Sequence, residues 1–197
     1  VITLDLPSHG VTGATPEGDY SQLGMARFVD AFVTKLGLTQ FVLGGNSMGG
    51  GVAARYAAMF PQKVTKLILV DAGGIASPVP RSMPLAFQLA RTPVLNQLFL
   101  HVTPRFVFAG SLRDAMAKDE VITEEMIDRY HELALLPGNR EATLKRLNTE
   151  SDDWLDAHLG DIAAPTLVLW GSEDHWVPIE VGDIFNKRIA DSQMNVL

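Results

Sequence analysis

The apolar tripeptide Phe41-Val42-Leu43 runs directly into a glycine-dense segment, Gly44-Gly45-Asn46-Ser47-Met48-Gly49-Gly50-Gly51, and then into a helical pattern that Pro61 ends. This order predicts a strand, a tight turn and a helix. Within the turn, residues 45–49 match G-x-S-x-G, the pattern of a nucleophile elbow, in which a serine sits at a sharp strand-to-helix turn. The strained backbone projects the serine hydroxyl above the sheet, and the residues two before and two after must be small. We therefore predict that Ser47 is a nucleophile and that Gly45, Asn46 and Gly49 shape its turn.

A second interpretation of this segment is an ordinary glycine-rich turn that holds a phosphate at the helix N-terminus. The segment lacks both the lysine of a P-loop and the spacing G-x-G-x-x-G. These two differences favour the nucleophile elbow.

Short apolar runs alternate with helical patterns along the chain, which predicts an α/β fold with a mostly parallel sheet. Strands are expected at residues 1–5, 41–43, 67–71 and 166–170, of which the first and third are expected to be buried, and a further strand starts near residue 193. Helices are expected at residues 21–36 and 179–189. The first of these helices has an apolar face formed by Leu23, Phe28, Phe32 and Leu36.

The strand pattern stops between residues 77 and 148, where prolines separate short amphipathic helical segments. One helix is expected to begin after Thr123 as N-cap, with Glu124 and Glu125 complementing the helix dipole. The sequence thus predicts a core at residues 1–76 and 149–197, interrupted by a helical cap at residues 77–148.

Composition excludes several classes of protein. The chain has 16 Lys+Arg against 23 Asp+Glu, a net charge of −7, which argues against a nucleic-acid partner. Its longest apolar run has five residues, whereas a transmembrane helix needs about 20, so no transmembrane segment is expected. Cysteine is absent, and no His/Asp/Glu cluster shows ligand spacing, so we expect no metal or other cofactor. Oligomeric state stays open, and so does the compartment, with the cytoplasm favoured.

A serine nucleophile needs a general base, and the base needs an acid to orient it. The candidate acid is Asp174, in the turn at residues 170–174 just after a strand, because catalytic groups of open α/β sheets gather at the carboxyl ends of strands. Asp71 ends the preceding strand and is the competing acid. Glu173 is expected to point elsewhere.

The base is not evident among the five histidines His9, His101, His131, His158 and His175. We expect each of them to be a surface or loop histidine. The order Ser…Asp…His predicts a base downstream of Asp174, in a loop after the strand that starts near residue 193.

These residues resemble the α/β-hydrolase superfamily across essentially the whole chain. Residues 5–10 (DLPSHG) are similar to the loop after the family's fourth strand, with Ser8 where a glycine is usual. Residues 45–49 resemble the elbow, residues 166–178 the acid-bearing turn, and residues 77–148 the cap. The resemblance implies that Ser47 is the nucleophile, Asp174 the acid, and the backbone N–H of Met48 one oxyanion donor.

The resemblance also implies an incomplete domain. The second oxyanion donor is expected from a loop before Val1, and the histidine beyond Leu197. The family's third strand lies between the fourth and fifth, so residues 1–6 would lack a neighbour joining them to residues 40–44. We therefore predict that the 197-residue chain alone folds poorly and is inactive.

Serine at position 47 disfavours haloalkane dehalogenases and epoxide hydrolases, which use a carboxylate nucleophile. Residues 46–50 together with the cap look like the meta-cleavage-product hydrolases, which split C–C bonds in dienol acids. That family places a substrate-binding arginine where Tyr130 stands here, and Arg129 lies one residue earlier on a different helix face.

Because an ester needs no such arginine, the first expectation is a serine hydrolase acting on a small apolar ester through an acyl-enzyme. The second is a C–C bond hydrolase of a ketone substrate, and the third is a binding protein without turnover. The predicted cap contains apolar residues that suggest a hydrophobic substrate pocket: Leu85, Phe87, Leu95, Leu98, Phe99, Phe106 and Phe108.

Overall fold

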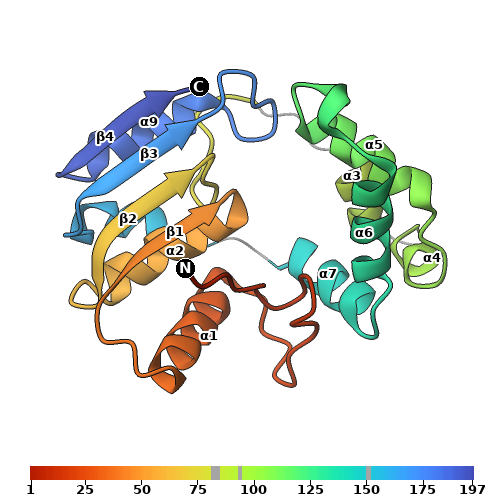
Figure 1. Ribbon diagram of the computed structural model, residues 1–197, viewed down its shortest axis with the longest axis horizontal. Coiled ribbons are helices and arrows are strands. Elements are labelled where there is room, and N and C mark those ends of the chain that lie inside the picture. Colours follow the sequence, from red (N-terminus) through yellow and green to blue (C-terminus); the bar gives the residue numbers. More distant parts are fainter. Residues whose placement is uncertain (81–84, 93–94, 150–151) are drawn as a thin grey trace. The chain divides into compact units, whose positions relative to one another are not determined.

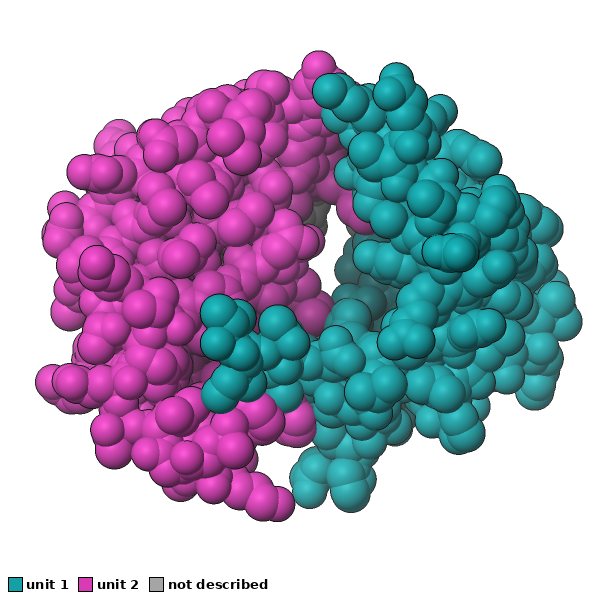
Figure 2. Space-filling view, in the orientation of Figure 1, with its two compact units in different colours: residues 1–20, 82–150 teal, residues 21–81, 151–197 magenta. Residues whose placement is uncertain are grey.

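The computed structural model describes residues 1–80, 85–92, 95–149 and 152–197 (Figure 1). These residues form two compact units, which Figure 2 colours separately. The helical unit comprises residues 1–20 and 82–150, and the sheet unit comprises residues 21–81 and 151–197. The division into a core and a cap at residues 77–148 stays a prediction, and residues 1–20, which it assigns to the core, group with residues 82–150.

The sheet unit contains the predicted parallel sheet. Its four strands lie in sequence order, from orange to blue in Figure 1: β1 (Phe41–Asn46), β2 (Val64–Val70), β3 (Thr166–Trp170) and β4 (Ser192–Val196). Helix α2 (Met48–Met59) connects β1 to β2, and α9 (Ile179–Arg188) connects β3 to β4. Parallel neighbours require such crossovers, so the alternation in the sequence correctly predicts this architecture.

One face of the sheet packs against these helices. The ring of Phe41 lies 6.0 Å from that of Tyr56 on α2, and a Cβ at Gly182 on α9 would lie 2.7 Å from the Trp170 ring. On this face Trp170 is fully buried, whereas on the opposite face Val42 is 55% exposed. A buried strand was predicted at residues 67–71. β2 instead alternates between buried and partly exposed positions there, because the crossover helices cover one face of the sheet.

Residues 1–6 form no strand, and Val1 and Ile2 are exposed, so the prediction of a buried strand at residues 1–5 is wrong. An extended segment becomes a strand only when its N–H and C=O groups pair with a neighbour. The described sheet consists of β1 to β4, and residues 1–6 have no place in it.

Helix α1 (Gln22–Lys35) begins and ends as predicted, and the Ser21 hydroxyl accepts a hydrogen bond from the backbone N–H of Gly24. Its buried face is a different one from that predicted. Leu36 is exposed and Phe32 is only half-buried, whereas the buried residues are Met25, Ala26, Val29 and Val33. Both sets have helical spacing, so periodicity alone does not choose between them.

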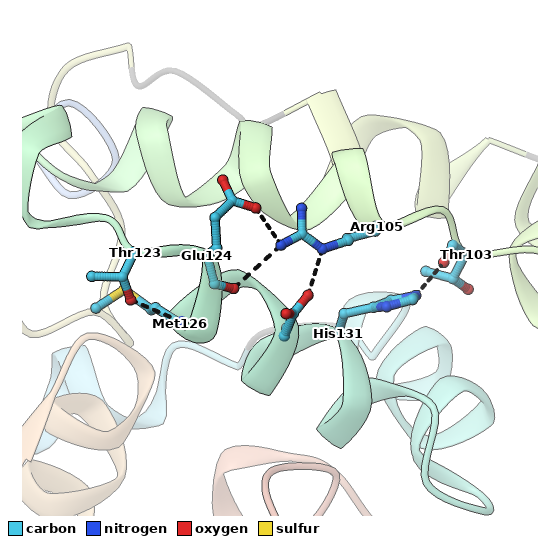
Figure 3. Close-up of polar contacts among 7 residues, drawn as sticks. Thr103, Arg105, Thr123, Glu124, Met126 and His131 are labelled. Atoms are coloured by element: carbon cyan, nitrogen blue, oxygen red, sulfur yellow. Dashed lines mark hydrogen bonds and ion pairs between the residues drawn. The ribbon is translucent and has the colours of Figure 1, made fainter.

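The helical unit consists of loops at residues 1–20 and a series of helices: α3 (Leu85–Arg91), α4 (Leu95–His101), α5 (Arg105–Ala115), α6 (Glu124–Ala134) and α7 (Asn139–Leu147). Thr123 caps α6 as predicted, because its hydroxyl accepts from Met126 N–H at 3.1 Å (Figure 3). Arg105 at the start of α5 forms ion pairs with Glu124 and Asp128 on α6, at 2.6 and 2.5 Å. These contacts fasten α5 to α6.

The apolar residues that suggested a pocket divide between two roles. Phe87 and Phe99 pack on a cluster formed by Ala90, Leu144 and Leu147, and Phe108 packs on Ala109, Leu112 and Ile127. Leu98 and Phe106 are exposed. The side chains of Leu85 and Leu95 lie outside the described residues. Core packing therefore accounts for three of the seven.

A buried arginine ties α2 to the segment that returns to the sheet unit before α8 (Trp154–His158). The side chain of Arg55 is 3% exposed; its Nη1 donates to Asp152 Oδ1 at 2.7 Å, and its guanidinium lies 4.7 Å from the Trp154 ring centre. Asp152 is 49% exposed, so water shares the solvation of this pair. Replacing Asp152 leaves a buried cation with a weaker partner.

We expect Asp152→Asn to lower the free energy of unfolding of the full-length protein by about 1–2 kcal/mol near neutral pH. The hydrogen bond from Arg55 lowers the pKa of Asp152, so the carboxylate stabilises above its unfolded-state pKa near 4 and loses that effect as the pH falls through the lower folded-state pKa. Urea titrations near pH 7 and pH 3 check this, with Asp153→Asn as the adjacent control. A difference between variant and wild type that persists undiminished at pH 3 would contradict the charge-based account.

Candidate active site

Ser47 occupies the turn between β1 and α2 with φ 51° and ψ −120°, a conformation that few non-glycine residues adopt. Its backbone is held by surrounding hydrogen bonds. Ser47 N–H donates to Val70 O at 2.9 Å, and Ser47 O accepts from the N–H groups of Gly50 at 3.0 Å and Gly73 at 2.9 Å. The predicted strained strand-to-helix turn is therefore confirmed.

The glycines two before and two after Ser47 differ in their surroundings. A Cβ on Gly45 would lie 2.2 Å from the carbonyl oxygen of Gly49, whereas a Cβ on Gly49 would meet nothing within 4 Å. Gly45 is therefore required by the backbone of the turn itself. The prediction that both positions must be small is wrong for Gly49, because a Cβ there would point into open space even though the Gly49 backbone lies against Gly45.

We expect Gly45→Ala and Gly49→Ala to change stability in opposite directions. The first forces a side chain into backbone that cannot move aside and should cost about 3 kcal/mol or more. The second replaces a helical glycine in α2 and should stabilise by up to about 1 kcal/mol. Urea unfolding of both variants measures the difference. Equal destabilisation by the two would show that the elbow does not have this geometry.

The groups beside Ser47 face the carboxyl end of the sheet. The Ser47 side chain is half-buried and caps no helix N–H, and the Asn46 Nδ2 donates to Val70 O at 3.2 Å, which ties β1 to β2. Met48 is the first residue of α2, and N–H groups in a first helical turn point toward the helix N-terminus, where negative charge is favoured. The arrangement suits the development of negative charge next to the Ser47 hydroxyl.

Asp174 lies in the turn after β3, half-buried, with one carboxylate oxygen firmly held. Its Oδ1 accepts from the N–H groups of Trp176 at 2.7 Å and Val177 at 2.9 Å, and the indole N–H of Trp170 donates to Val177 O at 2.9 Å. No described residue donates a hydrogen bond to Oδ2. The turn thus orients the Asp174 carboxylate and leaves Oδ2 able to accept a hydrogen bond from a further donor.

Asp71 follows β2 and joins the two turns. It has a φ of 44°, and its Oδ1 accepts from Gly171 N–H at 2.8 Å. Burial raises the pKa of the Asp71 carboxyl, and the charge of Asp174 raises it further, whereas the bond from Gly171 acts in the opposite direction. The loops after β1, β2 and β3 therefore meet at one edge of the sheet, as expected for an open parallel sheet. The sequence indicated a turn-capping role for Asp71, with the catalytic acid as the alternative, but it did not identify Gly171 as the partner.

Two histidines belong to the sheet unit. His158 Nδ1 lies 2.7 Å from Trp154 O with its ring stacked on Trp154, and His175 is exposed beside Asp174. Neither imidazole hydrogen-bonds to Ser47 or Asp174.

The other three histidines belong to the helical unit. His9 Nδ1 is within 3.1 Å of Pro7 O, and burial, followed by the charge of Arg146, lowers its pKa. His131 Nε2 contacts Thr103 O at 2.9 Å (Figure 3), and His101 ends α4. Ser8, which stands where the family has glycine, is buried with a φ of 71°.

Two further properties concern the described residues as a whole. They include no group of three or more His, Asp or Glu side chains arranged to hold a metal ion. No helix among them is both long and apolar enough to cross a membrane.

Comparison with known proteins identifies the family to which the chain is similar. The sequence profile described as alpha/beta hydrolase fold matches residues 1–197. A 2-hydroxy-6-oxo-6-phenylhexa-2,4-dienoate hydrolase from Burkholderia cepacia is 31% identical over 206 aligned positions, which cover 100% of this chain and 68% of that protein.

Solved structures agree in fold. The 2-hydroxy-6-oxo-6-phenylhexa-2,4-dienoate hydrolase from Rhodococcus sp. strain RHA1 is similar with a TM-score of 0.79 at 21% identity, covering 98% of this chain and 69% of that one. An esterase from Exiguobacterium antarcticum is similar with a TM-score of 0.76 at 24% identity, covering 98% of this chain and 70% of that one. A membrane phospholipase A also matches, and the chain spans 60% of its length.

Proposed function

Because the chain belongs to the alpha/beta hydrolase fold family, we propose that it contributes the nucleophile and the acid of a serine hydrolase that cleaves small-molecule carboxylic esters. The observation that carries this proposal is the strained backbone of Ser47 at the same sheet edge as the Asp174 carboxylate, whose Oδ2 accepts no hydrogen bond from the part of the chain that the structure describes. An intact serine and acid also argue against a binding protein without turnover.

In the proposed mechanism Ser47 Oγ attacks the ester carbonyl and the alcohol leaves, giving an acyl-enzyme that water then hydrolyses. The Met48 N–H stabilises the oxyanion of each tetrahedral intermediate. Asp174 Oδ2 accepts the N–H of a histidine and holds it in the tautomer that removes the Ser47 proton. The location of this histidine beyond Leu197 stays a prediction from the order Ser…Asp…His.

Hydrolysis of a C–C bond is the second candidate, because the relative at 31% identity is named as a hydrolase of a dienoate. A dienoate carries a carboxylate, which is best bound by an arginine. The resemblance to the meta-cleavage-product hydrolases implies that their substrate-binding arginine corresponds to Tyr130 on α6, and Arg129 lies one residue earlier, about 100° away around the helix axis. Both side chains are exposed, and Arg129 forms no ion pair with another described residue. This position favours the ester over the dienoate.

Steady-state rates of the full-length protein on 4-nitrophenyl butyrate and on a 2-hydroxy-6-oxo-dienoate distinguish the two candidates. An ester hydrolase is expected to prefer the nitrophenyl ester and to be indifferent to Arg129→Ala. Preference for the dienoate, with a KM that Arg129→Ala raises, would reverse the order of the candidates. Arg140→Ala on α7 is the control for loss of a cation.

A further inference from the structure

We propose that Asp71 is a positioning residue, which holds the turn that carries Asp174 in place relative to Ser47. This inference rests on the proposed function, since it assigns Asp71 a part in the same reaction. Asp71 itself is not assigned a contact with substrate or with the reacting atoms.

The loop that begins at Asp71 is fastened on both sides. Toward the elbow, Gly73 N–H donates to Ser47 O at 2.9 Å. Toward the acid turn, the Asp71 backbone N–H donates to Leu169 O at 3.0 Å, and its carboxylate accepts from Gly171 N–H at 2.8 Å. One short loop therefore links the strand end that carries the nucleophile to the strand end that carries the acid.

Gly171 passes this constraint on to Asp174. Its N–H is held by the Asp71 carboxylate, and its carbonyl oxygen accepts from Asp174 N–H at 3.2 Å. Asp71 and Asp174 are therefore linked through Gly171 by two hydrogen bonds, one to its N–H and one to its carbonyl oxygen. Loss of the acceptor on Asp71 frees one side of this bridge and lets Asp174 move relative to Ser47.

The conformation and the surroundings of Asp71 are both unfavourable for an ionised aspartate, and the hydrogen bond from Gly171 favours its charged form. The residue has a left-handed φ, and its carboxyl is half-buried near the carboxylate of Asp174, whose charge disfavours ionisation of Asp71. Asparagine and glycine both tolerate the left-handed region, and only asparagine keeps an oxygen that can accept from Gly171. This difference supplies a matched pair of variants.

The test compares Asp71→Asn and Asp71→Gly in the full-length protein, with 4-nitrophenyl butyrate as substrate and a fluorophosphonate to titrate active sites. Asp71→Asn is expected to keep kcat within about threefold of wild type. Asp71→Gly is expected to lower kcat per titrated site by about 10- to 100-fold with KM within about twofold, since a displacement of about 1 Å can cost that much. A purely structural role would lower the number of titrated sites and leave kcat per site unchanged.

A second pair of variants changes the hydrogen-bond donor, Gly171 N–H, and tests the proposal if Asp71→Gly does not fold. Gly171→Ala keeps the N–H, and its Cβ would lie 3.7 Å from Asp71 Oδ1, an ordinary contact, so it should behave as wild type. Gly171→Pro removes the N–H and should reproduce the loss of kcat seen in Asp71→Gly.

Three results would overturn the proposal. Unchanged kcat in Asp71→Gly and in Gly171→Pro would show that the bond does not position Asp174. A loss in Asp71→Asn as large as that in Asp174→Asn would make Asp71 the acid itself. A wild-type protein that neither reacts with the fluorophosphonate nor turns over ester would overturn the proposed function and this inference together, and is recognised before any variant is made.

Discussion

Ser47→Ala is expected to lower kcat of the full-length protein by about 10⁴- to 10⁶-fold and to abolish fluorophosphonate labelling, because no other group replaces the attacking oxygen. Stability should change little. The serine hydroxyl caps no helix N–H, and alanine and serine share the Cβ that experiences the positive φ of 51°. The change therefore removes the nucleophile without removing a structural contact seen among the described residues.

Ester turnover, labelling and thermal melting of the same preparation measure this expectation. Ser172→Ala is the matched control, since Ser172 is an exposed serine in the acid turn and uses its backbone N–H to contact Leu197 O. Wild type without labelling or turnover would favour a binding protein of the same fold. Labelling that survives Ser47→Ala would place the nucleophile elsewhere.

Asp174→Asn is expected to lower kcat by on the order of 10⁴-fold while KM changes little. Asparagine keeps an oxygen that can accept from Trp176 and Val177 N–H, so the turn is preserved. Its amide no longer stabilises a histidine cation or selects the required tautomer. The expected loss is therefore one of catalysis and not of folding.

The measurement is kcat for ester hydrolysis by wild type, Asp174→Asn and Glu173→Gln. Glu173 is the control because it is the exposed neighbour of Asp174 and carries the same charge. Equal losses in the two variants would point to a general charge effect on the turn. A small loss in Asp174→Asn combined with a large loss in Asp71→Asn would move the acid to the end of β2.

Periodicity and local motifs predicted much of the fold correctly. The cap of α6 at Thr123, the start of α1 at Ser21 and the presence of strands β2 and β3 each depend on residues within a few positions of one another. The predictions that failed depended on a partner outside the local segment. Residues 1–6 have the composition of a strand but pair with no strand of the described sheet. The buried face of α1 is set by the residues that pack on it, which lie outside the helix.

The candidate site divides in the same way. The sequence by itself determined a strand, an elbow and a helix around Ser47, and an acid turn at residues 170–174, because short-range backbone sterics and glycine content control such turns. Only the tertiary structure decided that Gly45 and not Gly49 is sterically required, and that Asp71 contacts Gly171, 100 residues away. The first depends on the path of the backbone through the turn, and the second depends on how strands adjoin in the sheet; the spacing of residue types specifies neither.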